Sequence, residues 1–247
     1  MTATLPSRAG STRSRTTRAD AVPSDAVARA VGSAGGALLA AAFGLLARVR
    51  GTRALHPVGV GGTGSLRVSP GLKSGVPLLD EVGPHPCRVR WSRATGLQRG
   101  PDVEGLAVRI EGPAAGDVLF ASTGTGVATR HVLTVRPARS HGPLTTLLPV
   151  QTARGSLLLR LDPLTADEDP PTAYALLIAA PGQPWHERGR LDIVWSHEDC
   201  RRRHDPVGRP PAGTWTHPLW ARLRAPSYGS SQEVGADVHT ASVRDER

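Results

Sequence analysis

The chain is poor in several residue types that often build a framework or a site. Its 247 residues include two cysteines, two tyrosines, two phenylalanines and no asparagine. Cys87 and Cys200 are too few for a disulfide scaffold and too far apart for a cysteine-based zinc site. The 28 glycines and 22 prolines follow no period, which excludes collagen and repeat arrays. We therefore expect a globular protein of a reducing compartment, and we predict a cytoplasmic location.

Positive charge is in excess, with 30 basic residues against 21 acidic ones and a net charge of +9. Nearly all of the basic side chains are arginine, because Lys73 is the only lysine. Chains rich in alanine, glycine, proline and arginine are typical of GC-rich genomes, so part of this charge reflects coding bias. A nucleic-acid surface also needs aromatic side chains beside the cations, and the few aromatics lie elsewhere. We predict no nucleic-acid partner.

The two ends of the chain differ from its middle. Residues 1–22 are rich in serine, threonine and arginine and are predicted to be a disordered basic tail, and residues 229–247 a second disordered tail. Residues 23–52 are predicted to form an N-terminal helix or arm, which could join two copies of the chain. Its uncharged part, residues 30–47, is diluted by small residues and falls short of the roughly 20 apolar residues of a membrane span. A packing helix is favoured, and contact with a membrane is the alternative.

Residues 53–228 are predicted to form one mainly β domain, which ends in a short helical segment near residues 219–223. Short apolar runs alternate with glycine, proline and aspartate turns, and several runs have the period of two that is typical of half-buried strands. Eight such runs without a long helical pattern between them indicate an antiparallel barrel or sandwich. The expected strands are Ser65–Ser69, Cys87–Arg93, Gly105–Glu111, Asp117–Ser122, His131–Arg136, Ser156–Asp162, Ala173–Ala180 and Arg190–Ser196.

A histidine followed by closely spaced glycines stands at the start of this domain. Arg53 precedes His56 by three residues, and glycines follow at positions 59, 61, 62 and 64. Glycines at this density let the backbone turn tightly or approach a bulky ligand closely. The run is neither GxxxxGK[ST] nor a GxGxxG that opens a helix after a strand, so nucleotide binding is not predicted.

The second motif lies near the end of the domain, where Arg224 precedes Tyr228 by four residues. On a helix these two side chains would share one face. A cation beside a phenol lowers the pKa of the phenol and favours phenolate, and tyrosinate is one of the axial ligands that haem iron takes in proteins.

Taken together and in this order, the motifs resemble those of the haem-dependent catalases. The family's Arg-x-x-His-x-x-Gly-x-Gly-x-x-Gly is matched at every position from Arg53 to Gly64. Its Val-Arg-Phe-Ser corresponds to residues 89–92, with tryptophan in place of phenylalanine, and residues 102–110 keep the Asp, Gly, Ala, Val and cation of the next run. Its Arg-x-x-x-Tyr is matched by residues 224–228.

The resemblance implies an eight-stranded antiparallel barrel of the catalase type that holds ferric b-type haem. His56 would be the distal acid–base group, and Ser92 would hold its imidazole in orientation. Tyr228 would be the ligand of the haem iron.

Three arginines would complete the haem site that the resemblance implies. Arg224 would keep the proximal phenol deprotonated. Arg53 and Arg90 would bind the haem propionates, a task that suits a planar and permanently charged guanidinium.

One departure from the family concerns the distal asparagine, which has no counterpart because the chain contains no asparagine. Ser122 offers a hydroxyl near the corresponding position and is the expected substitute. We therefore expect a peroxidase-like enzyme whose substrate is a small-molecule hydroperoxide, rather than a fast catalase. The alternative is a catalase-fold module that binds haem or lipid without turnover.

Other catalytic classes have little support. The residues from His197 to Asp205 include histidines and carboxylates, but their spacing fits no metal motif and indicates a polar loop after the last strand. There is no GxSxG elbow for a serine hydrolase. Short catalase-like chains are sometimes labelled phosphodiesterases, but the Gly-Asn-His element of dinuclear phosphodiesterases is missing.

Overall fold

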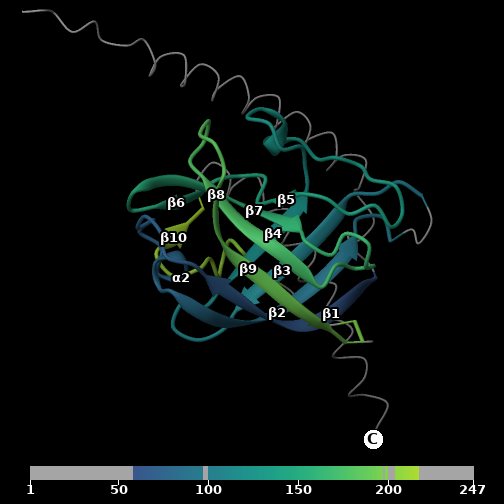
Figure 1. Cartoon of the computed structure of the whole chain (residues 1–247), viewed down its shortest axis with the longest axis horizontal. Helices are drawn as coiled ribbons and strands as arrows, with labels where there is room; N and C mark the ends of the chain where they lie inside the picture. The colour runs from purple at the N-terminus through teal and green to yellow at the C-terminus, as the bar shows by residue number, and fades with distance from the viewer. Residues whose placement is uncertain (1–57, 97–99, 197, 200–203, 217–247) are drawn as a thin grey trace, which may run out of the picture.

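The computed structural model of the chain describes residues 58–96, 100–196, 198–199 and 204–216 (Figure 1). The predicted tails and the arm with its apolar run at residues 30–47 lie outside these residues, as does the predicted helical segment at 219–223. Four predicted site residues also lie outside them, namely Arg53, His56, Arg224 and Tyr228.

The described residues form ten strands and two short helical turns. The strands are β1 (Gly59–Val68), β2 (Gly83–Arg93), β3 (Glu104–Ile110), β4 (Gly116–Ser122), β5 (Leu144–Thr145), β6 (Val150–Thr152), β7 (Gly155–Pro163), β8 (Ala173–Ala179), β9 (His186–Trp195) and β10 (Thr214–Trp215). The helical turns are α2 (Pro77–Asp80) and the 3-10 turn η1 (Thr129–His131). In this part of the chain, no helix has the length and apolar character needed to cross a membrane.

Eight of the strands close into a barrel. They follow the order β7-β5-β4-β3-β2-β1-β9-β8, each antiparallel to the next, and β8 pairs with β7 to close the ring. Figure 1 shows these strands wrapped around one core, with β6, β10 and α2 gathered at one end. The predicted eight-stranded antiparallel β-barrel is therefore confirmed.

Alternation along the strands separates an inner from an outer face of the barrel. On β2, the side chains of Cys87 and Val89 are buried in the core, whereas Arg88 points outward and is exposed. Residues in phase with them on the neighbouring strands complete the core, among them Leu66, Leu106, Val108, Ile110, Val118, Phe120, Leu161, Tyr174, Leu176 and Leu191.

The glycine-rich run that precedes the expected first strand is itself strand. β1 begins at Gly59, six residues before the predicted start at Ser65. A Cβ atom at Gly62 would lie 2.7 Å from the carbonyl oxygen of Val194, and one at Gly64 would lie 2.8 Å from that of Asp192. These two glycines are therefore needed for the close approach of β1 and β9, which explains part of the run without a ligand.

The predicted strand at residues 131–136 is wrong. The chain forms η1 there and then only two isolated bridges, Thr123 with Leu133 and Asp102 with Arg136. This segment does not run along a neighbouring strand, and its apolar residues Val132 and Val135 are each 57% exposed. The place between β4 and β7 is taken by the two-residue strand β5, which is too short to show a periodic pattern.

Candidate functional site

The two predicted site residues within the described part of the chain, Arg90 and Ser92, lie on the same side of β2. Their side chains alternate with the inward-facing Val89 and Trp91 and therefore point out of the barrel. Ser92 is 5% exposed. The structure thus brings together a cation and a hydroxyl at one end of β2, on the outer face of the barrel.

Small residues surround Ser92 on this outer face. Gly59 of β1 and Gly105 of β3 lie directly opposite Ser92, and Ala121 of β4 lies opposite Gly105. The row from β1 to β4 therefore consists of glycine, serine and alanine only. No large side chain of this row therefore projects from the outer face of the sheet.

Arg90 binds a carboxylate beside this row of small residues. Its Nε donates to Oδ1 of Asp199 at 2.8 Å, and its Nη2 donates to Oδ2 at 3.0 Å. The backbone N–H of Gly59 donates to the same Oδ2 at 3.1 Å. A side chain at position 59 would collide with the guanidinium, because its Cβ would lie 2.7 Å from Cζ of Arg90. The three donors therefore fit a carboxylate, and in this structure the carboxylate is that of Asp199.

Asp199 reaches Arg90 through a short segment that follows β9. Ser196 donates to the carbonyl oxygen of Gly61 from both its N–H and its hydroxyl, each at 2.8 Å. The N–H of Gly61 donates in turn to the carbonyl oxygen of Glu198 at 3.1 Å. These bonds hold the segment along the end of β1, so that Asp199 lies across Gly59.

Ser122, the expected substitute for the distal asparagine, faces the other side of the sheet. It is fully buried on the inner face of β4, in phase with Phe120. Its hydroxyl donates to the carbonyl oxygen of Thr134 at 2.6 Å and accepts from the N–H of Glu104 at 3.1 Å. Ser122 therefore joins the barrel to the following loop and does not share a face with Ser92.

Sequence reasoning missed a buried acid–base cluster inside the same end of the barrel. Glu104 is 4% exposed, and its Oε1 accepts hydrogen bonds of 2.7 Å from Nε1 of Trp91 and from Nδ1 of His141. On its other side, Nε2 of His141 lies 3.2 Å from Oδ1 of Asp169, close enough for an ion pair but not aligned as a hydrogen bond. The sequence does hold one signal, because Glu104 is in phase with the inward-facing Leu106.

The electrostatics of this cluster follow from its burial. Burial alone would lower the pKa of His141, but the hydrogen bond and charge of Glu104, together with the charge of Asp169, raise it above its ordinary value. Burial raises the pKa of Tyr174 far above its ordinary value, and the charge of Glu104 raises it further. Oε2 of Glu104 and Oη of Tyr174 are buried without a hydrogen-bond partner among the described residues.

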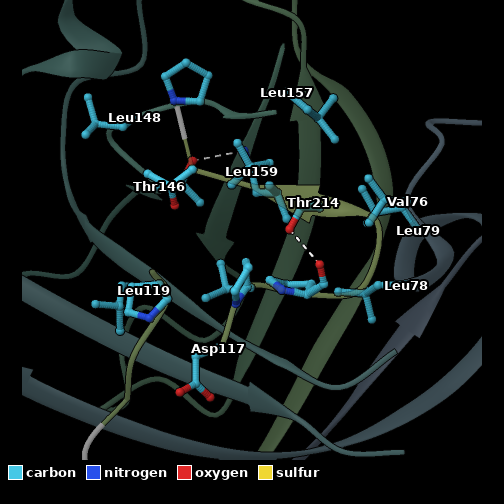
Figure 2. Close-up of a pocket in the computed structure, with 17 residues that line it drawn as sticks. Val76, Leu78, Leu79, Asp117, Leu119, Thr146, Leu148, Leu157, Leu159 and Thr214 are labelled. Carbon is cyan, nitrogen blue, oxygen red and sulfur yellow. Dashed lines mark hydrogen bonds between the residues drawn. The ribbon is translucent and has the colours of Figure 1, made fainter. Parts of the chain in front are cut away.

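A separate apolar pocket lies at the other end of the barrel, beside α2 (Figure 2). Its volume is about 40 Å³, and its walls include Leu78 and Leu79 of α2 and Leu159 of β7. Figure 2 shows the carboxylate of Asp117 turned away from the centre of the pocket, and this carboxylate is bound by Arg109. The pocket therefore suits a small apolar group and is too small for a planar macrocycle.

A wider groove of about 390 Å³ lies on the outer surface of β1, β8 and β9. It is open, and its lining includes hydroxyl side chains such as Thr63 and Thr172 as well as the exposed ion pair of Arg190 and Asp192. Because it has no buried titratable group, it offers little for catalysis.

The comparisons with known proteins agree with the topology. No protein-family model and no curated protein matches the chain. Among solved structures, the chain is similar to a bacterial catalase, with a TM-score of 0.54 and 14% sequence identity over 93% of this chain. The chain has a catalase-like fold. The match covers 66% of that catalase, so the catalase-like barrel described here corresponds to only part of the larger protein.

Proposed function

We propose that the chain is a haem-binding protein that acts on hydroperoxides, with the haem lying against the outer face of β1 to β4. The observation that carries this proposal is the placement of Arg90 and Ser92 on one face of a catalase-like barrel, beside a row of glycine and alanine. A guanidinium beside a row of small residues suits a planar ligand with carboxylates at its rim. The catalase-like fold supports the same assignment.

In this proposal, bound haem would supply ferric iron and its redox chemistry. His56 would accept a proton from one peroxide oxygen and return it to the other. Gly59 follows His56 by three positions, so the chain itself keeps the Cα atom of His56 within about 11 Å of that of Gly59, which pairs with Ser92. Ser92 would orient the imidazole.

The remaining assignments concern how the cofactor would be held. Arg53 and Arg90 would bind its carboxylates by charge-assisted hydrogen bonds. Tyr228 would be the iron ligand, and Arg224 would favour its phenolate form, because a nearby cation lowers the pKa of a phenol.

A second candidate function is a haem-binding module without turnover. The orientation of Ser122 favours it, because this hydroxyl is bonded inside the barrel and provides no second polar group on the face of Ser92. In this case the protein would carry or sense haem, and His56 would not be needed for a reaction.

Absorbance of the protein supplied with haem tests whether the cofactor binds. The wild-type protein is expected to show a Soret band and the signature of ferric tyrosinate. Tyr228→Phe should abolish the tyrosinate signature, whereas Tyr174→Phe, which alters the chain's other tyrosine, should leave it unchanged. A colourless wild-type protein would refute the haem proposal.

Peroxide consumption separates the two candidate functions. Wild-type protein and His56→Ala should be given hydrogen peroxide or cumene hydroperoxide with an organic electron donor, with the exposed His186→Ala as the matched control. An enzyme should lose most of its rate in His56→Ala alone. If haem binds but no variant consumes peroxide, the module without turnover is the better description.

A further inference from the structure

Asp199 fills a site whose donors are arranged for a carboxylate. The guanidinium of Arg90 donates a hydrogen bond to each of its oxygens, and the N–H of Gly59 donates a third. We propose that Asp199 is an internal competitor, which a carboxylate ligand must displace from Arg90 and Gly59 before it can bind. Where that ligand is haem, this inference rests on the function proposed above.

The donors of this site lie in a pair of strands, whereas the carboxylate they bind lies in the following segment, which Ser196 and Glu198 tie to Gly61. Arg90 and Gly59 belong to the paired strands β2 and β1, where Gly59 lies opposite Ser92 and Arg90 lies opposite Gly61, two pairs along the same ladder. Asp199 instead lies in the segment after β9, beyond the last ladder pair of that strand at Trp195. Departure of Asp199 would therefore leave the shape of the donor set intact.

The charges also favour an exchange. The side chain of Arg90 is 15% exposed and that of Asp199 is 26% exposed, so the pair is shielded but still in reach of solvent. Replacing one carboxylate by another keeps the guanidinium neutralised throughout the exchange.

Competition of this kind lowers the apparent affinity for the ligand. Only molecules in which Asp199 has left Arg90 can bind a carboxylate there, so the apparent Kd rises by the inverse of their fraction. Asp199→Asn keeps the size of the side chain and removes its charge. It should lower the Kd for haem by about tenfold, which corresponds to an open fraction of about one tenth in the wild type.

The experiment compares wild type, Asp199→Asn, Asp199→Ala and a matched control. Asp192→Asn is the control, because Asp192 also pairs with an arginine on the outer face and the substitution changes the net charge equally. Haem binding is followed by Soret absorbance, with haem dimethyl ester as a ligand that lacks carboxylates. The Asp199 variants should bind haem more tightly than wild type and Asp192→Asn, with no gain for the ester. Equal or weaker haem binding by both Asp199 variants, in a protein that does bind haem, would overturn the inference.

A second probe keeps the inference separate from the haem proposal. Butyrate offers a carboxylate without a macrocycle, and its effect on thermal stability is measured for the same four proteins. It should raise the Tm of the Asp199 variants more than that of wild type or Asp192→Asn. If no protein binds haem but butyrate has this selective effect, the carboxylate site stands and the haem proposal falls. If butyrate acts equally on all four proteins, no such site exists.

Discussion

His141 donates a hydrogen bond of 2.7 Å from Nδ1 to Oε1 of Glu104, and so ties a loop to a carboxylate inside the barrel. Nδ1 of His141 is assigned as the donor because an ionised carboxylate can only accept. The opposite nitrogen of His141 faces Asp169 in the loop between β7 and β8. One imidazole therefore joins a barrel strand to two loops, and two carboxylates raise its pKa.

This arrangement predicts that the protein loses stability as the pH rises. A histidine whose pKa is raised by folding stabilises the native state fully at pH values below its unfolded pKa of about 6.5. The contribution disappears as the pH rises through the higher folded pKa of His141. The free energy of unfolding, measured by urea denaturation between pH 5.5 and 9, should therefore fall across this range.

The variant His141→Gln should show a flatter profile and a lower stability at pH 6. It leaves Glu104 buried without its charged partner, which typically costs about 3 kcal/mol. His186→Gln, at an exposed position of β9, serves as the control and should keep the wild-type profile. A wild-type profile in His141→Gln would contradict the assignment of this pH dependence to His141.

Most of the barrel could be predicted from sequence because several of its strands alternate between apolar and polar residues. The run from Arg88 to Ser92 shows the period of two directly, and the structure puts its apolar members in the core. Two strand segments could not be predicted in this way. Gly59 to Gly64 carries no alternating pattern because glycine has no side chain, and β5 is only two residues long.

Only those residues of the candidate site that belong to a sequence motif could be predicted. The motif singled out Arg90, but nothing local to it indicates Asp199, which lies 109 residues away and meets it through the closure of β9 onto β1. Contacts between distant segments depend on topology, which local patterns do not contain. The pairing of His141 with Glu104 escaped for the same reason, since the histidine lies in a loop without periodicity.

Tyr174→Phe is predicted to leave the stability unchanged or to raise it slightly. The hydroxyl of Tyr174 is fully buried, and among the described residues it has no hydrogen-bond partner. Removing a buried hydroxyl without a partner removes its desolvation cost, so we expect a change between zero and a gain of about 1 kcal/mol. Chemical denaturation of the two proteins measures it. A loss above about 1 kcal/mol would mean that the hydroxyl has a partner.

Arg130 and Trp185 are predicted to stabilise each other. The guanidinium carbon of Arg130 lies 4.6 Å from the centre of the Trp185 ring, and the arginine is only 2% exposed. Its Nη1 also donates to the carbonyl oxygen of Gln183 at 3.1 Å. A desolvated cation over an indole is worth about 1–2 kcal/mol. A double-mutant cycle of Arg130→Met and Trp185→Leu should therefore give a coupling energy of about this size, whereas additive effects would exclude the contact.

Leu159→Ala is predicted to enlarge the apolar pocket and to destabilise the barrel. Leu159 is 5% exposed and lines the pocket beside α2, so truncation removes buried methyl groups and adds to an existing space of about 40 Å³ (Figure 2). Such substitutions usually cost about 3 kcal/mol, and apolar cavities of this kind can bind benzene. Denaturant unfolding should show the loss, and benzene should raise the Tm of Leu159→Ala but not of wild type. Leu72→Ala, at a position that is 92% exposed, should show neither effect. If benzene stabilises all three proteins equally, it binds elsewhere and Leu159→Ala opens no cavity for it.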